Sequence, residues 1–99
     1  MIDFEEAKVL VFAFINDTFR LVGEPLVIIE RETIEKEYGW IFFYNTKSFV
    51  EQGDVSNALA GNSPLVCEKR DASIHFLGST ALPTETLIKA YEESRDKQS

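Results

Sequence analysis

The stretch Gly39–Asn45 constrains the fold more than any other part of the sequence, because it is apolar on both sides when extended. The side chains of a strand alternate between its two faces. Trp40, Phe42 and Tyr44 would share one face, and Ile41 and Phe43 the other. Both faces then need cover, so the stretch is expected to be a central strand of a sheet.

Three further strands are predicted around it. Leu26–Ile34 is rich in β-branched residues, and Leu65–Glu68 and Ile74–Leu77 are short apolar runs bounded by turn residues. Glu35–Tyr38 and Arg70–Ser73 are short enough to be hairpin turns. Because no connection between successive strands is predicted to form a crossover helix, we expect an antiparallel meander.

A helix is predicted before the first strand. Asp3 and Glu6 have the spacing of a capping box, and Gly23 followed by Pro25 predicts the helix end. Its apolar face is predicted to hold Phe4, Ala7, Val11, Phe14, Ile15 and Thr18. Three apolar residues at the borders of that face predict a helix deeply surrounded by its neighbours: Leu10, Phe12 and Phe19. Asn16 is predicted on the opposite, polar side.

The remaining segments are a long loop and a second helix. Thr46–Ser63 is predicted as the loop, with Asp54 beginning one helical turn that extends to Leu59. Pro83 suits the first turn of a C-terminal helix. The narrow apolar stripe of that helix is Leu87, Ile88 and Tyr91.

The predicted fold class is α+β: an N-terminal helix, a four-stranded antiparallel meander sheet and a C-terminal helix. A chain of 99 residues has room for one modest core. Residues 1–99 are therefore predicted to form a single domain, with fraying at Lys97–Ser99.

The charge balance bears on possible partners. Seventeen acidic and ten basic residues give a formal net charge of −7. The first fifty residues carry nine acids and five bases, and the rest carry eight and five, so the acidity is spread along the chain. Such a surface repels a phosphate backbone, which argues against nucleic-acid binding. It suits a basic protein partner, although acidity also serves solubility alone.

The residues that usually carry catalysis are scarce. Cys67 and His75 are the only cysteine and histidine, so one chain cannot assemble a zinc site from nitrogen and sulfur ligands. A core role is expected for Cys67, and a structural or surface role for His75, pointing opposite to Ile74 and Phe76. We expect no enzyme activity, no cofactor and no metal.

Sequence features also indicate the compartment. A single cysteine forms no intramolecular disulfide, which favours a reducing environment. The sequence shows no secretory leader pattern, and its longest apolar run, Val9–Ile15, is too short to cross a bilayer. A cytoplasmic location without membrane contact is therefore expected.

Two features suggest contact with a protein partner. The run from Glu30 to Glu37 carries four carboxylates, at Glu30, Glu32, Glu35 and Glu37, which a hairpin end can present to a basic surface. Alternatively, these charges protect an edge strand from aggregation. Trp40, near a strand end, is a candidate contact residue as well, with core packing as its other possible role.

The segment Gly61–Pro64 is a demanding turn just before a buried strand. Gly61 permits positive φ, Asn62 tolerates a left-handed conformation, and Pro64 holds Ser63 extended. Together these residues force a sharp entry into the sheet. Local geometry explains them without a binding role.

Three motifs give the chain a family resemblance: GWIFFYNT (39–46), LAGNSPLVCEK (59–69) and IHFLGSTALPTETLIKAYEE (74–93). In their order and spacing they resemble the immunity protein 35 family, also called YrhB-like. The chain departs from the family pattern at Ala72, where the family often has glycine, and in a slightly longer segment from Gly78 to Pro83.

The resemblance implies a small protein that protects a bacterium from a cognate polymorphic toxin by stoichiometric binding. It implies a scaffold role for the shared motif residues: Gly39, Trp40, Phe42, Tyr44, Gly61, Asn62, Pro64, Gly78, Pro83 and Tyr91. The variable acidic surface would then provide specificity for one toxin. One branch of the family is chaperone-like, so a holdase that binds unfolded chains is the alternative. Both a monomer and a homodimer remain open.

Overall fold

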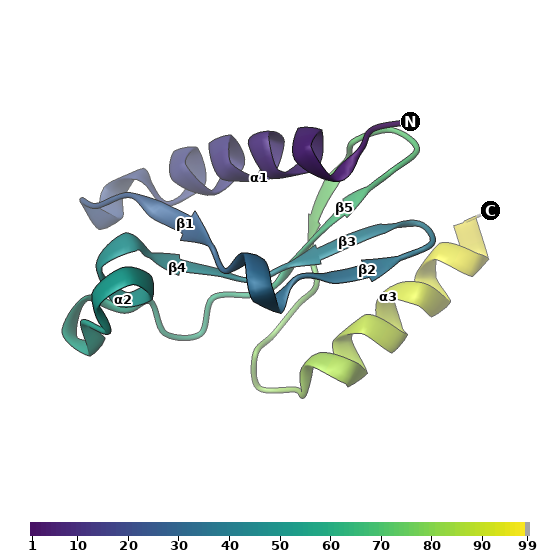
Figure 1. Ribbon diagram of the computed structural model, residues 1–99. Coiled ribbons are helices and arrows are strands. Elements are labelled where there is room, and N and C mark those ends of the chain that lie inside the picture. The colour runs from purple at the N-terminus through teal and green to yellow at the C-terminus, as the bar shows by residue number, and fades with distance from the viewer. Residues whose placement is uncertain (99) are drawn as a thin grey trace.

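A computed structural model describes residues 1–98 and shows a sheet layer between two helices (Figure 1). Helix α1 lies along one face of the strands and helix α3 along the other, as Figure 1 shows. The helices are α1 (Phe4–Thr18), α2 (Lys47–Gln52) and α3 (Thr84–Gln98). Short 3₁₀ helices are η1 (Arg20–Val22), η2 (Glu30–Glu32) and η3 (Val55–Asn57). The strands are β1 (Leu26–Ile28), β2 (Ile34–Lys36), β3 (Gly39–Phe42), β4 (Tyr44–Thr46), β5 (Leu65–Glu68) and β6 (Ile74–Phe76).

The strands form a four-stranded antiparallel sheet in the order β2-β3-β5-β6 and a two-stranded antiparallel sheet, β1-β4. The predicted α+β class is confirmed, with a meander in the larger sheet and a helix at each end of the chain. Strand β3 lies between β2 and β5, so the predicted central position of this stretch is correct.

Two predicted strands are each divided in two. Ile28 pairs with Tyr44 and Ile34 pairs with Ile41. Between these two pairs, one arm of the hairpin therefore has five residues (29–33) and the other arm has only two (42 and 43). The extra residues of the longer arm form η2. Unequal lengths of this kind bend a hairpin. The single strand predicted over Leu26–Ile34 is therefore wrong in extent, and Gly39–Asn45 is interrupted at Phe43.

The core has one apolar cluster on each face of the sheet. Beneath α1 it consists of Ala7, Val11, Ile15, Leu26, Trp40, Phe42, Tyr44, Leu65 and Cys67. On the α3 face it consists of Ile41, Val66 and Ile88, with Tyr38 and Tyr91 packed against them. The prediction that the central strand is covered on both faces is confirmed.

The prediction that neighbours surround α1 deeply is wrong. Leu10 is 41% exposed and Phe12 48%, and the adjacent Val9 is 69% exposed. The reason is that the sheet covers α1 on one face only, as Figure 1 shows. The predicted inner positions Ala7, Val11 and Ile15 are fully buried.

The helical wheel predicted Asn16 on the solvent side of α1, but the structure places its side chain against β1. Its Oδ1 accepts a hydrogen bond from the backbone N–H of Leu26 at 2.8 Å. Its Nδ2 donates to the carbonyl oxygen of Leu26 at 3.0 Å, and to that of Phe12 at the same distance. The Asn16 side chain thus provides hydrogen-bond partners for both the N–H and the carbonyl oxygen of Leu26. A neighbouring strand would otherwise provide these partners at the edge of β1.

Asn16→Ala is expected to lower the free energy of unfolding by about 2 kcal/mol, because two partly buried backbone groups of Leu26 lose their partner. Urea unfolding followed by tryptophan fluorescence measures this loss. Asp17→Ala, at the exposed neighbouring position, is the matched control and should change stability by less than about 0.5 kcal/mol. Equal losses in the two variants would contradict the role assigned to Asn16.

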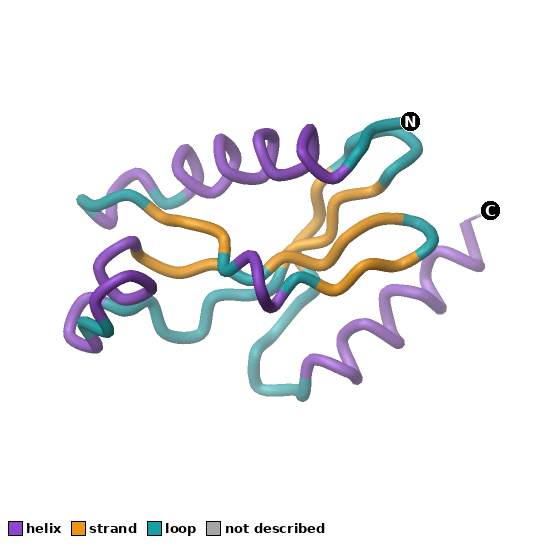
Figure 2. Tube along the Cα trace, in the orientation of Figure 1, coloured by secondary structure: helices purple, strands orange, loops and turns teal. Residues whose placement is uncertain are grey.

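The predicted long loop contains an unpredicted helix, α2 (Figure 2). The Thr46 side chain caps it by accepting a hydrogen bond from the Phe49 N–H at 3.3 Å, and Gly53 ends it with φ 70°. The helical turn expected after Asp54 is η3. Asp54 accepts hydrogen bonds from the side chains of Ser56 and Asn57. Thr46 and Gly53 were the sequence signals that could have predicted α2.

The β5–β6 turn holds Ala72 at φ 61°, a left-handed conformation that favours glycine. Alanine costs conformational energy here, because its Cβ approaches the following carbonyl oxygen in this conformation. Asp71 supports the turn by accepting a hydrogen bond from the Ser73 N–H at 3.0 Å.

Ala72→Gly is expected to raise the free energy of unfolding by about 0.5–1 kcal/mol. Relief of the left-handed conformation outweighs the greater entropy that glycine gives to the unfolded chain. A thermal melt should show a rise in Tm of about 2–8 °C for a domain of this size. A lower Tm would contradict the strain assigned to Ala72.

Candidate functional site

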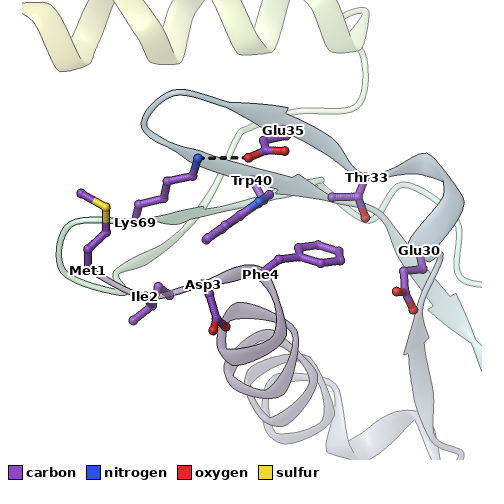
Figure 3. A pocket seen from close by; sticks show the side chains of 9 residues that line it. All are labelled: Met1, Ile2, Asp3, Phe4, Glu30, Thr33, Glu35, Trp40 and Lys69. Atoms are coloured by element: carbon purple, nitrogen blue, oxygen red, sulfur yellow. Dashed lines mark hydrogen bonds and ion pairs between the residues drawn. The ribbon is translucent and has the colours of Figure 1, made fainter.

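An open pocket of about 580 Å³ lies between the start of α1 and the β2–β3 hairpin (Figure 3). We call it the α1–β2 pocket. Residues 1–4 line it together with Glu30, Thr33, Glu35, Trp40 and Lys69. It therefore combines aromatic, carboxylate and ammonium groups that come from four separate parts of the chain.

Local structure explains the aromatic side of the pocket. The capping box is present: Asp3 Oδ1 accepts from the Glu6 N–H at 2.8 Å and Glu6 Oε1 accepts from the Asp3 N–H at 3.2 Å. This fixes the first turn of α1 and directs Phe4 inward. The Phe4 ring lies 6.0 Å from the centroids of both Trp40 and Phe42. The backbone near the start of the chain also bonds to the residue that follows β5, by the hydrogen bond from the Ile2 N–H to the Lys69 carbonyl at 3.0 Å.

The carboxylates of Glu30 and Glu35 are each paired with a lysine that also contacts an aromatic ring. Lys69 Nζ lies 3.2 Å from Glu35 and 5.0 Å from the Trp40 ring centroid. Lys8 Nζ lies 2.7 Å from Glu30 and 4.8 Å from the Phe4 ring centroid. Hydrogen bonds to Glu30 first and to Glu5 second raise the pKa of Lys8. Glu30 and Glu35 remain well exposed, so these pairs contribute little to stability.

The pocket also holds an unsatisfied polar atom. Among residues 1–98, Thr33 Oγ1 is the buried side-chain oxygen without a hydrogen-bond partner. In Figure 3 the Thr33 hydroxyl points toward the side of the pocket where Phe4 and Glu30 lie. A buried hydroxyl of this kind is completed by a hydrogen-bond partner, either an ordered water or a ligand atom.

Three of the five predicted partner-binding residues, Glu30, Glu35 and Trp40, meet at this pocket. Glu32 lines a separate hollow of about 160 Å³ beside Asn62 and Pro64, and Glu37 lies exposed in the β2–β3 turn. Trp40 is only 4% exposed, so its main contacts are those of a core residue. Whether these five residues bind a partner stays a prediction.

Phe4, Thr33 and Lys69 were missed as pocket residues. Phe4 was predicted only as part of the apolar face of α1. Cross-strand pairing puts Glu35 opposite Trp40, and Trp40 opposite Cys67, which brings Lys69 alongside. No local sequence pattern reveals this register.

The Gly61–Pro64 turn is held by contacts to β4. Gly61 has φ 75°, and the Asn62 side chain donates to the Tyr44 carbonyl at 2.8 Å. The Tyr44 hydroxyl donates to the Ser63 carbonyl at 2.7 Å, and burial raises the pKa of Tyr44 to about 12. The Ser63 hydroxyl accepts from the Gly78 N–H at 3.0 Å, which ties the turn to the start of the β6–α3 connection. The scaffold role of the motif residues stays a prediction.

A second polar site lies under α3. Glu68 is 1% exposed, and it accepts hydrogen bonds from Arg95 Nε at 2.7 Å and from Arg95 Nη2 at 2.8 Å. The hydroxyl of the motif residue Tyr91 also donates to Glu68. Burial alone would raise the pKa of Glu68, but the Arg95 and Tyr91 hydrogen bonds outweigh it and lower the pKa. A carboxylate so well supplied with donors is a poor general base.

This Glu68 network also anchors α3. The Arg95 guanidinium lies 4.4 Å from the Tyr38 ring centroid, and the Tyr38 hydroxyl donates to Glu92 at 2.8 Å. An adjacent cavity of about 450 Å³ is lined by Glu68, Tyr91 and Arg95 and by the exposed His75. Sequence reasoning placed Glu68 only at a strand end and missed the network.

Cys67 is a core residue and His75 a surface residue, as the sequence predicted. Cys67 is fully buried, and burial raises the pKa of its thiol to about 11, which disfavours the reactive thiolate. His75 is exposed, with Nε2 2.9 Å from the Ser73 hydroxyl. Within residues 1–98, no cluster of three or more His, Cys, Asp or Glu side chains is arranged to hold a metal ion. In that same part of the chain, no helix is long and apolar enough to span a membrane.

Comparisons with known proteins show what this chain is similar to. An uncharacterised protein of Escherichia coli K12, YrhB, is 43% identical over 54 residues, which are 54% of this chain and 56% of that protein. The chain thus spans little more than half the length of this relative. No solved structure shows significant similarity to the chain described here. The family model for immunity protein 35 matches residues 6–94. Because that match covers nearly the whole sequence, the chain belongs to the immunity protein 35 family.

Proposed function

We propose that this protein neutralises one cognate bacterial toxin by forming a stoichiometric complex with it in the cytoplasm, without catalysis. Family membership implies an immunity role in general. The observation that carries the finer proposal is the α1–β2 pocket, where Glu30, Glu35 and Trp40 gather in one open hollow. The proposed partner is a toxin domain with a basic contact surface, bound by a monomer or a homodimer of this chain.

The proposed mechanism is steric. The net charge of −7 attracts a basic toxin surface and speeds encounter. The exposed carboxylates of Glu30, Glu32, Glu35 and Glu37 then pair with that surface around the pocket. An interface of standard size, burying about 1,200–2,000 Å² in total, is enough to cover a toxin active site or the path to it. Glu68 and the core residues keep the scaffold rigid.

A protection assay tests the proposal. Cells that express the toxin domain encoded beside this gene should stop growing, and co-expression of this chain should restore growth. A toxin domain from an unrelated system is the control, because specific immunity should give no protection against it. Protection against neither toxin would contradict the proposed function.

A holdase role is the second candidate, and exposed apolar side chains favour it. Val9 is 69% exposed, Phe12 48% and Leu21 92%, all along α1 and η1. Such surface can bind unfolded chains weakly. Suppression of the thermal aggregation of a model substrate, lost in Val9→Ser/Phe12→Ser, would support this role. Unchanged aggregation would argue against it.

A further inference from the structure

We infer that the α1–β2 pocket binds the guanidinium group of an arginine side chain presented by the partner. The identity of that partner rests on the proposed function, whereas the preference for a guanidinium rests on the pocket itself. Three features support the inference: unused hydrogen-bond acceptors, aromatic faces that already contact cations, and the balance of charge.

The acceptors are spread around the pocket. Glu30 binds Lys8 through Oε1, and Glu35 binds Lys69 through Oε2. Within residues 1–98, the second oxygen of each carboxylate makes no hydrogen bond, and neither does the buried Thr33 Oγ1. A guanidinium offers five N–H donors in a planar fork, which suits several separate acceptors better than the compact ammonium of lysine.

The aromatic faces of the pocket already attract positive charge. Lys8 lies over Phe4 at 4.8 Å, and Lys69 lies over Trp40 at 5.0 Å. Both ammonium groups lie at the ends of flexible side chains and pair with exposed carboxylates. An incoming guanidinium can therefore take the place of one ammonium against the rings. Its flat, weakly hydrated surface stacks on aromatic rings more favourably than an ammonium does.

The balance of charge selects a cation over other ligands. Three carboxylates, those of Asp3, Glu30 and Glu35, line the pocket, whereas two ammonium groups lie at it: Lys69 lines it and Lys8 pairs with Glu30 at its rim. An anionic side chain would be repelled. An apolar side chain would leave the Thr33 hydroxyl without a partner. Arginine combines the required charge, donors and flat surface.

A small probe tests the pocket without the toxin. Trp40 is the only tryptophan, so its fluorescence reports on the pocket directly. N-acetyl-arginine amide is expected to change this fluorescence saturably in the millimolar range. N-acetyl-citrulline amide, which has the same shape without the charge, is expected to cause no saturable change. An equal response to both probes, or no saturable response to the arginine probe, would overturn the inference.

Charge-removing variants locate the binding. Glu30→Gln/Glu35→Gln is expected to weaken binding of the arginine probe about tenfold or more, because two charge-assisted contacts are lost. Glu85→Gln/Glu93→Gln, on the exposed side of α3, is the matched control and should bind as the unmodified protein does. Both variants change exposed residues, so unchanged melting temperatures verify that they fold. Unweakened binding by Glu30→Gln/Glu35→Gln would overturn the inference.

The toxin separates this inference from the proposed function. If the toxin domain binds the unmodified protein but binds Glu30→Gln/Glu35→Gln equally well, the proposed function stands and the arginine site is rejected. If the arginine probe binds through Glu30 and Glu35 but the toxin domain does not bind, the pocket chemistry stands and the proposed partner is rejected. Weakened binding of both the probe and the toxin supports both.

Discussion

Gly39→Ala is expected to lower the free energy of unfolding by about 3 kcal/mol or more, a large part of the stability of a small domain. A Cβ atom at this position would lie 2.1 Å from the carbonyl oxygen of Cys67 on the neighbouring strand. Because both groups belong to paired backbones of the central sheet, neither can move without disturbing the β3–β5 register. Urea unfolding monitored by Trp40 fluorescence gives the loss.

Gly53→Ala is the matched control for that prediction. Gly53 has φ +70°, but a Cβ there would meet no atom within 4 Å. The loss of unfolding free energy in Gly53→Ala therefore reflects only the conformational cost of alanine in a left-handed position, about 1–2 kcal/mol. If Gly39→Ala costs no more than Gly53→Ala, close approach of the two strands is not the reason for glycine at position 39.

Arg95→Met is expected to cost about 3 kcal/mol at neutral pH, the lower end for breaking a buried ion pair, because Arg95 is itself partly exposed. Methionine preserves most of the aliphatic stem, so the main loss is the pair of hydrogen bonds to Glu68. The Glu68 carboxylate would then be buried with too few donors, and the anchor of α3 would weaken.

The pH dependence of that variant distinguishes lost charge pairing from lost packing. In the unmodified protein the pKa of Glu68 is lowered, so its stabilising contribution is present above the ordinary glutamate pKa, about 4.3, and is lost as pH falls through the lowered value. In Arg95→Met, we expect burial to outweigh the remaining Tyr91 hydrogen bond and raise that pKa, so that protonation relieves the destabilisation. The stability gap between the two proteins should therefore narrow as pH falls.

Arg70→Met is the control for the Arg95 prediction. Arg70 lies 3.8 Å from the same carboxylate, but its side chain is 62% exposed. Its loss should cost less than about 0.5 kcal/mol, with little pH dependence. A stability gap for Arg95→Met that stays constant from neutral pH to pH values below 4 would contradict the role assigned to the Glu68 network.

The fold class could be predicted from the sequence because apolar patterning determines which faces are covered. Alternation in Gly39–Asn45 identified a central strand, and the Asp3–Glu6 capping box identified the start of α1. Local pattern did not show where β1 and β2 separate. The unequal lengths of the two hairpin arms, and hence η2, follow from pairing partners that are distant in the sequence.

The same limit applies to the α1–β2 pocket. Its carboxylates Glu30 and Glu35 stand out as charges near a hairpin. Lys69 joins them only through the β2-β3-β5 register, and Phe4 only through the packing of α1. The Glu68 network was hidden for a related reason, since its partners Tyr91 and Arg95 come from the C-terminal helix.

A calorimetric titration of the cognate toxin domain with this protein tests the central claim of dedicated immunity most directly. The predicted result is a one-to-one complex with Kd near the nanomolar range, which corresponds to a binding free energy of about −12 kcal/mol. A folded, active toxin domain that gives no binding heat at two temperatures would contradict the claim.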